Sequence, residues 1–517
     1  MEYGKLSQQL NENMKLIERL ITAVFFFFIL LILLLSVRGL PGVPNETELN
    51  LKEWSDSGPF ELSPERARFA LTYSILENKS IFLDNELAKF SLPDLGYVNG
   101  KFVSLFVPGI SYLLIPGFYL GKLFNATQLG GYLVITLFAF LNTIVIYKIC
   151  LRLTSNKAVS LISSGIFIFA TPAFTYAVSL FQHHVSTFLL LLACYILLTS
   201  KRFLGIIFVF FICSLSIIID FPNFFMLLPV GILGVVRLFN VAATEDRIRF
   251  TLSLKQILPI IAILIPLSAL LLFNKYSYGN PFKLSGSVTQ LKKFEELSEE
   301  ESESSDGKSI SGLFNLSYIP QGAYEHLLSV DRGLLFFTPV LIFGLLGINN
   351  LRKKNKAFTY LLLSVTITNI SLYSSFGIGG WSFGSRYLVP SYAMLSILLS
   401  TFLSENKNKF LFAVFYLALI YSVAVNTAGA ISSSKNPPKY EAIGLQLVTG
   451  RTELYSFDRN ILLIFEGKSK SFVFQNYLKS YTDARTFYIA LVALIVLVLS
   501  LPTLIILTKD LKNNYEK

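Results

Sequence analysis

The sequence predicts an all-α membrane protein with about 12 transmembrane helices. Of the 517 residues, 53% are hydrophobic and 15% are charged, and the mean hydropathy is +0.58. A soluble chain of this length carries far more charge. The apolar runs are long and lack the polar–apolar alternation of a membrane β-barrel. Basic residues gather in short loops between these runs, which is the pattern that sets membrane topology.

The apolar runs divide the chain into twelve expected spans. They cover residues 18–38, 129–150, 158–178, 185–200, 203–220, 222–240, 256–273, 333–350, 357–376, 387–404, 410–430 and 486–508. One further apolar run, 105–124, is interrupted by Pro108-Gly109 and Pro116-Gly117. Because prolines break helices, we expect a re-entrant or amphipathic surface helix there instead of a span.

Twelve spans place both termini and the short basic loops in the cytoplasm, as the positive-inside rule requires. We expect a multi-span core at 1–430 whose first outer loop is 39–128. A small extracytoplasmic segment follows at 431–485, and 486–517 forms the last transmembrane helix and a cytoplasmic tail. The net charge of +11 is explained by topology, so no nucleic-acid partner is expected.

A dense group of carboxylates and arginines occupies residues 56–109, directly after the first span. Pro64 is a favourable first residue for a helix, and Glu65 falls in its first turn. We expect this helix to be amphipathic, to lie along the membrane and to present Glu65 and Arg68 to a substrate. Lys101 would meet a lipid phosphate at headgroup depth. The alternatives are that Glu65 only complements the helix dipole, worth about 0.3–1 kcal/mol, and that Lys101 only snorkels to the interface.

Three more polar residues mark outer ends of spans. His183 and His184 are adjacent, so their side chains diverge on a helix. We expect hydrogen bonds to a substrate, with a structural role at the interface as the alternative. Asp220 lies at a membrane edge, where a carboxylate is costly unless it is partnered or hydrated, which favours a place in the site. The spacing of these residues does not support a divalent metal site.

Aromatic and basic residues complete the candidate set. Tyr276 and Tyr278 could stack on a sugar or belong to an interfacial aromatic belt. Trp381 is preceded by two glycines that allow close backbone approach to a ligand. Arg332 and Arg386 are expected to bind a phosphate, because the planar guanidinium matches its geometry.

These segments resemble the C-fold membrane glycosyltransferases that use polyprenyl-phosphate sugars, a group that includes protein O-mannosyltransferases and aminoarabinose transferases. P-E-R-A-R-F-A is similar to the motif that carries the acidic residue of the first outer loop, with Glu65 where the family commonly has Asp. G-K-F-V-S-L-F-V-P-G resembles the segment that implies Lys101 as the carrier-phosphate contact. N-K-Y-S-Y-G-N-P and G-G-W-S-F-G-S-R-Y-L-V-P also resemble recurring family segments.

The resemblance implies transfer of a sugar from polyprenyl phosphate to an acceptor hydroxyl on a protein, lipid or glycan, with inversion. Glu65 would be the general base, and Lys101 and Arg386 would hold the leaving phosphate. No nucleotide cofactor is implied. Two other functions stay open: a flippase or transporter of lipid-linked saccharides, and an O-antigen-type polymerase or ligase.

Overall fold

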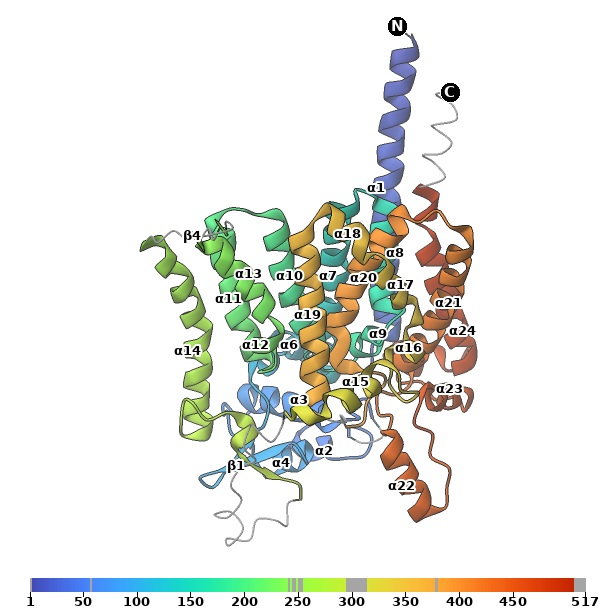
Figure 1. The fold of residues 1–517 in the computed structure, drawn as a ribbon. Coiled ribbons are helices and arrows are strands. Elements are labelled where there is room, and N and C mark those ends of the chain that lie inside the picture. The colour runs from blue at the N-terminus through green and yellow to red at the C-terminus, as the bar shows by residue number, and fades with distance from the viewer. Residues whose placement is uncertain are drawn as a thin grey trace.

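The computed structural model describes residues 2–55, 58–239, 242–243, 248–249, 254–293, 314–376 and 380–505. Helices cross the molecule side by side, and a layer of short elements covers one end of the bundle (Figure 1). The cytoplasmic tail expected after the last span lies outside these residues.

Among the described residues, seven helices are long and apolar enough to cross a membrane. They are Glu12–Ser36, Thr127–Thr154, Leu254–Tyr278, Lys356–Ser375, Arg386–Glu405, Lys409–Ile431 and Ala484–Ile505. Four shorter apolar helices, Lys157–Phe169, His183–Thr199, Phe203–Ile219 and Leu228–Leu238, occupy other expected spans. The prediction of an all-α multi-pass membrane protein is confirmed, whereas the count of twelve spans stays a prediction.

The helices of the bundle have the following bounds: α1 Glu2–Ser36, α7 Thr127–Thr154, α8 Lys157–Phe169, α9 Ala173–Ala177, α10 His183–Thr199, α11 Phe203–Ile219, α12 Asn223–Met226, α13 Leu228–Leu238, α14 Leu258–Tyr278, α16 Leu334–Phe337, α17 Phe343–Leu346, α18 Ile348–Lys354, α19 Lys356–Ser375, α20 Val389–Glu405, α21 Lys409–Ile431 and α24 Ala484–Ser500. The expected span 333–350 is therefore divided into α16, α17 and α18. A 3-10 turn, Pro339–Ile342, separates the first two.

The elements outside the bundle are α2 Glu46–Leu49, α3 Ser63–Leu76, α4 Asn85–Ser91, β1 Leu95–Val98, β2 Lys101–Ser104, α5 Gly109–Leu113, α6 Ile115–Leu123, β3 Ala242–Ala243, β4 Ile248–Arg249, β5 Thr289–Leu291, α15 Ile319–Leu327, α22 Lys439–Thr449 and α23 Phe457–Phe465. The region 105–124 contains only the short helices α5 and α6, and neither is long enough to span.

A small antiparallel sheet supports the layer of short elements outside the bundle. The sequence analysis did not predict this sheet. Its strand order is β2-β1-β5. Asn99 and Gly100 form the β1–β2 turn with φ of 50° and 76°, a geometry that the Asn-Gly pair adopts readily. Leu95 pairs with both Ser104 and Leu291, so the sheet joins the first outer loop to the segment after α14.

Helix α3 differs from the expected surface helix. Nine of its residues are buried, because it packs against α4, α5 and α6 beneath the bundle. Its N-cap is Leu62, and the Ser63 hydroxyl instead donates to Asp94.

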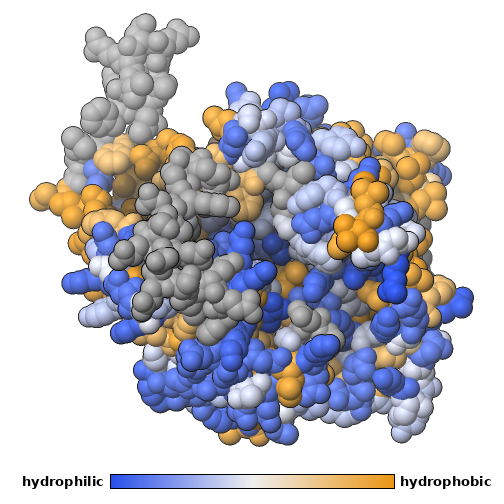
Figure 2. Space-filling view, turned by 90° about the horizontal axis from the view of Figure 1, so that it is seen from below, coloured by the Kyte–Doolittle hydropathy of each residue, from blue (hydrophilic) through white to orange (hydrophobic). Residues whose placement is uncertain are grey.

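Helix α20 lies at the centre of the bundle, in contact with α7, α8, α10 and α19. Helix α14 lies at the periphery and packs mainly on α11. The amino-terminal part of α1 and the short helix α18 point to one end of the bundle, and α3, α4 and β1 cover the other (Figure 1). Seen from this covered end, hydrophilic side chains occupy much of the surface and hydrophobic ones gather toward the sides (Figure 2).

Candidate active site

A polar cavity of about 480 Å³ opens beneath the bundle, between α3 and the start of α20. Its walls carry six charged side chains. The lining residues are Glu61, Leu62, Ser63, Pro64, Arg66, Arg68, Pro93, Asp94, Phe106, Phe181, Gln182, His183, Phe376, Gly380, Trp381, Arg386, Tyr387 and Lys435. We refer to it as the polar cavity.

Asp94 reaches the polar cavity because the turn before β1 is fixed on both sides. The Arg66 guanidinium donates to the carbonyl of Phe90 at 2.9 Å and to that of Leu92 at 2.8 Å. The side chain of Gln290, in the strand β5 that pairs with β1, donates to the carbonyl of Pro93 at 2.9 Å. Asp94 accepts a 2.6 Å hydrogen bond from the Ser63 hydroxyl.

Burial raises the pKa of Asp94 above its usual value, although the Ser63 hydrogen bond and the charges of Arg68 and Arg386 oppose the shift. A carboxylate whose pKa is raised toward neutrality accepts a proton more readily than an exposed one. Asp94 therefore combines access to the cavity with a raised pKa.

Arg68 belongs to a hydrogen-bonded chain on the cavity wall. Its guanidinium donates to the Gln182 side-chain carbonyl at 2.7 Å, and the Gln182 amide donates to Asp220 at 3.0 Å. The guanidinium also lies 4.2 Å from the ring centroid of Phe106. Burial lowers the pKa of Arg68 to about 10, which keeps it cationic at neutral pH. Asp220, predicted as a site residue, thus acts on the cavity through Gln182.

Arg386 begins the 3-10 turn that leads into α20 and is 9% exposed. One terminal nitrogen donates to the Tyr387 hydroxyl at 2.9 Å, while Nε is buried and makes no hydrogen bond. A buried guanidinium N–H without an acceptor is costly. An anion within reach of Nε would satisfy it, and phosphate binding by this arginine stays a prediction.

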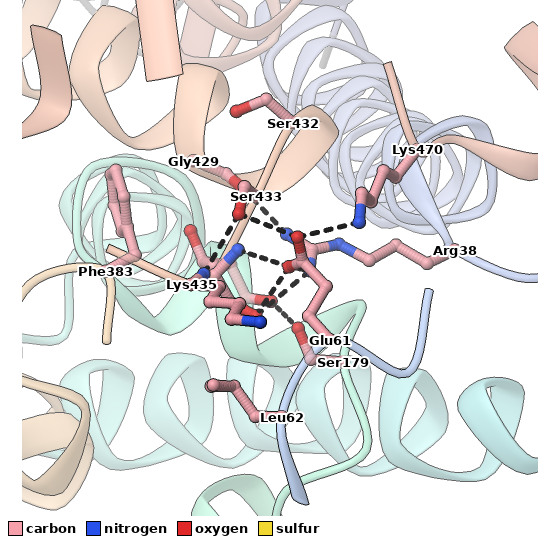
Figure 3. A network of polar contacts seen from close by, with 12 residues as sticks. Arg38, Glu61, Leu62, Ser179, Phe383, Gly429, Ser432, Ser433, Lys435 and Lys470 are labelled. Atoms are coloured by element: carbon pink, nitrogen blue, oxygen red, sulfur yellow. Dashed lines mark hydrogen bonds and ion pairs between the residues drawn. The ribbon is translucent and has the colours of Figure 1, made fainter. Parts of the chain in front are cut away.

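Glu61 is held in a network that joins distant segments (Figure 3). Its carboxylate accepts from Arg38 at 3.0 Å, from Lys470 at 2.7 Å, and from the Ser433 hydroxyl at 2.7 Å. Burial would raise the pKa of Glu61, but the charges of Lys470 and Arg38 outweigh it and lower the pKa to about 2. So strongly held a carboxylate is a poor proton acceptor, and its role is to fix the cavity wall.

Glu65, the predicted general base, does not line the polar cavity. It is fully buried. Its carboxylate accepts from the Leu180 amide at 3.0 Å, the Leu62 amide at 3.3 Å and the Tyr132 hydroxyl at 3.4 Å. Burial raises the pKa of Glu65 to about 7. We therefore assign Glu65 to the support of α3 and of the Leu180 backbone, not to contact with a substrate.

Two of the predicted phosphate ligands also lie away from the cavity wall. Lys101 is exposed on the β1–β2 hairpin, with its ammonium 4.3 Å from the ring centroid of Phe82. Arg332 is buried and paired with its neighbour Asp331 at 3.2 Å. Neither residue is brought together with Arg386 in the polar cavity.

The two adjacent histidines separate as the helical geometry predicts. His183 lines the cavity, stacked on Phe181 and edge-on to Tyr387. His184 is fully buried, 2.8 Å from the carbonyl of Ala173 and 3.2 Å from the Asn142 amide nitrogen. His183 thus lines the polar cavity and His184 does not. No group of metal-ligating side chains occurs among the residues that the structure describes.

An apolar groove of about 640 Å³ begins beside the polar cavity. Its lining residues are Ile81, Pro108, Gly109, Tyr112, Leu113, Phe138, Val185, Leu189, Leu215, Ile218, Ile219, Ala269, Leu272, Phe273 and Tyr276. The loop from Phe106 to Gly109 and the first turns of α10 contribute to both spaces. The two spaces share no lining residue but adjoin at these two segments, and the groove extends from there to α14.

The three aromatic residues predicted to contact a sugar lie in three different environments. Tyr276 is 68% exposed and lines the apolar groove. Tyr278 is buried, and its hydroxyl donates to the carbonyl of Ser104 at 2.9 Å, which anchors β2. Trp381 lines the polar cavity and donates through its indole nitrogen to Glu441.

The sequence reading missed several cavity residues, above all Asp94, Gln182, Tyr387 and Lys435. It also missed His326, whose ring nitrogen lies 2.8 Å from the Ser385 hydroxyl, directly before Arg386. Asp94 could have been found from its place immediately before an Asn-Gly hairpin. The others become neighbours only through tertiary contacts.

No family model and no curated protein matches this sequence. Among solved structures, 94% of the chain is similar to ArnT from Cupriavidus metallidurans. The apo state matches over 76% of that chain with 12% identity and a TM-score of 0.45. The form bound to undecaprenyl phosphate matches over 77% with 12% identity and a TM-score of 0.47.

The chain is also similar, over 83% of its length, to the archaeal oligosaccharyltransferase AglB from Archaeoglobus fulgidus in complex with an inhibitory peptide and a dolichol-phosphate. It spans 58% of that chain, with 13% identity and a TM-score of 0.41. One of the ArnT structures thus contains undecaprenyl phosphate, and the AglB structure contains a dolichol-phosphate. At such low identity the likeness concerns the fold alone.

Proposed function

We propose that the protein is a membrane glycosyltransferase that moves a sugar from a polyprenyl phosphate to an acceptor hydroxyl. The observation that supports this most is the junction between the polar cavity and the apolar groove, where neighbouring residues of the loop 106–109 and of the start of α10 line a cationic space and a hydrocarbon-lined one. A lipid-linked sugar phosphate matches both spaces, because its phosphate is anionic and its chain is hydrocarbon. Each buried CH2 of its chain would contribute about 0.8 kcal/mol.

The donor phosphate would lie between Arg68 and Arg386 at this junction. Both guanidiniums are buried, which strengthens their interaction with an anion. The Nε–H of Arg386 makes no hydrogen bond to the described residues and would donate to a phosphate oxygen. The prenyl chain would follow the groove past Val185 and Leu215 toward α14.

Asp94 would act as the general base in place of Glu65. It would take the proton of the acceptor hydroxyl as the oxygen attacks the anomeric carbon from the face opposite the phosphate. The bond between that carbon and the phosphate oxygen breaks, and polyprenyl phosphate leaves with the electron pair, its charge stabilised by Arg68 and Arg386. The configuration at the anomeric carbon inverts.

The site would face the extracytoplasmic side of a cell membrane. The elements that form it lie opposite the basic stretch Arg352–Lys354 at the end of α18 (Figure 1), and short basic loops stay in the cytoplasm. The acceptor would be a protein, a lipid or a glycan.

The direct test incubates purified protein in nanodiscs with polyprenyl-phosphate sugars and candidate acceptors, with no membrane gradient. Release of free polyprenyl phosphate together with a glycosylated product supports the proposal. Movement of the intact lipid between leaflets without sugar transfer would instead show a flippase and contradict it. Product formation only from diphosphate-linked oligosaccharides would show a polymerase or ligase.

A further inference from the structure

A second cavity of about 390 Å³ lies beside the polar cavity. Its lining residues are Glu61, Trp381, Ser432, Ser433, Lys435, Glu453, Arg459, Leu463, Lys468 and Lys470. Glu61, Trp381 and Lys435 line both spaces, so the two share part of one wall. The rest of the second cavity comes from the segment after α21, which forms no part of the proposed donor site.

The walls of the second cavity carry more positive than negative charge. Four of its side chains are basic and two are acidic. The Glu61 carboxylate is already compensated by Arg38 and Lys470. Arg459 lies 3.7 Å from Glu453, and Lys468 is paired with Glu466, outside the cavity, at 2.8 Å. When these partners and Arg38 are included, five basic side chains stand against three acidic ones. A cavity with this charge favours an anionic ligand, because its walls repel cations and lower the cost of desolvating an anion.

Trp381 adds an aromatic surface, which a site for a simple anion does not require. Its indole nitrogen is held by Glu441, and the Lys435 ammonium lies 5.7 Å from the centroid of its ring. A fixed indole offers an apolar surface on which the C–H face of a sugar packs, while nearby polar groups bind its hydroxyls. The hydroxyls of Ser432 and Ser433 line the same space.

We infer that the second cavity binds the acceptor and that this acceptor is an acidic saccharide, one that carries a carboxylate, sulfate or phosphate. The saccharide would contact Lys468 and Arg459 through its anionic group. Its neighbouring residue would pack on Trp381 and direct a hydroxyl past that side chain toward Asp94. This inference rests on the proposed function and names its acceptor class.

The indole itself provides a reporter. The chain has two tryptophans, Trp54 and Trp381, so Trp54→Phe leaves Trp381 as the sole source of indole fluorescence. In the full-length protein with this background, we expect trigalacturonate to change the Trp381 emission saturably. Added salt should weaken the effect, and maltotriose should have little effect. Inorganic phosphate tests whether an anion without a saccharide changes the Trp381 emission in the same way.

The charge requirement is tested with Lys468→Glu, which should weaken trigalacturonate binding about tenfold, since it replaces an attractive charge with a repulsive one. Lys479→Glu is the matched control, because Lys479 is exposed and outside the cavity. It should leave binding unchanged. Binding of undecaprenyl phosphate should be the same in both variants.

Equal responses to trigalacturonate and maltotriose would overturn the inference, as would equal affinity of Lys468→Glu and the parent protein. A response to inorganic phosphate as strong as that to trigalacturonate would also overturn it, because no saccharide would be recognised. These binding measurements need neither donor nor transfer. Intact acidic-saccharide binding with no transfer activity would therefore count against the proposed function and support this binding site.

Discussion

Arg38 and Glu61 form a buried ion pair with a 3.0 Å contact, and their side chains are 0% and 4% exposed. Arg38 also donates to the carbonyls of Gly429 at 2.9 Å and Ala430 at 3.3 Å. The pair thus joins the end of α1, the loop before α3 and the end of α21 (Figure 3). Glu61, one member of the pair, lines both cavities, so the pair holds part of their shared wall in place.

Loss of this pair should destabilise the protein strongly. Arg38→Gln leaves a buried carboxylate with only Lys470 as a charged partner, and such changes cost about 3–5 kcal/mol. We expect a clear fall in the thermal unfolding midpoint in detergent. The double variant Arg38→Gln/Glu61→Gln should recover part of the loss, because no uncompensated charge stays buried. An unchanged midpoint in Arg38→Gln would contradict the structural role.

The general base is tested by comparing two carboxylates. Asp94→Asn should reduce sugar transfer by about 10²–10⁴-fold, the usual contribution of general base catalysis, with little change in donor affinity. Glu65→Gln should retain most of the activity of the folded enzyme, since Glu65 does not line the polar cavity. Initial rates at saturating donor measure both. The reverse result would return the role to Glu65.

The pH dependence of transfer should carry the signature of Asp94. Its pKa is raised by burial, and only the ionised form accepts a proton. The rate should therefore fall as the pH drops through this raised pKa, and it should rise to a plateau above it. A pH–rate profile for Asp94→Asn that kept the same acidic limb would assign the limb to another group.

Hydropathy was sufficient to predict most of the scaffold, because a membrane helix is a continuous apolar run and its length is set by the bilayer. It did not predict that the expected span 333–350 is divided into three short helices. It also missed the hairpin around Asn99-Gly100, although that pair is a strong local turn signal. Asp94 directly precedes the first strand of this hairpin, so the turn signal also marks the position of Asp94.

The site was harder to predict for a physical reason. Glu61, Glu65 and Asp94 lie in one charged stretch, and sequence alone cannot tell which carboxylate is buried, which is ion-paired and which faces a cavity. The partners that decide this come from far along the chain, such as Lys470 for Glu61 and Leu180 for Glu65. Only the tertiary structure brings them together.

Donor binding should depend on Arg386 and not on Lys101. Arg386→Gln removes a charged donor from the wall of the polar cavity, and hydrogen bonds to charged groups contribute about 1.5–3 kcal/mol. We expect the apparent donor affinity to fall by one to two orders of magnitude, about 10- to 100-fold. Lys101→Gln should leave it unchanged, since Lys101 is exposed on the hairpin. Titration with undecaprenyl phosphate measures both variants.

The apolar groove should set the preference for prenyl chain length. Ala269→Trp places a large ring in the groove that Ala269 lines. It should weaken binding of long-chain donors more than of short-chain ones, since each buried CH2 contributes about 0.8 kcal/mol. Leu264→Trp, on the same helix but outside the groove, is the control. Equal loss for both chain lengths would place the lipid elsewhere.

The stability of the protein should fall as pH rises through the range in which Glu65 ionises. Its pKa is about 7 in the folded state against 4.5 in its unperturbed state, so the native state holds a proton that the unfolded state has already lost. The contribution of this group is complete below pH 4.5 and is lost as pH rises to about 7, with a total of about 3 kcal/mol. Glu65→Gln cannot ionise, so its thermal midpoint should vary less between pH 5 and pH 8, taken as about the range of this titration. Parallel pH profiles for the variant and the parent protein would show that Glu65 is already ionised in the folded state, with its charge satisfied by the Leu180 and Leu62 amides.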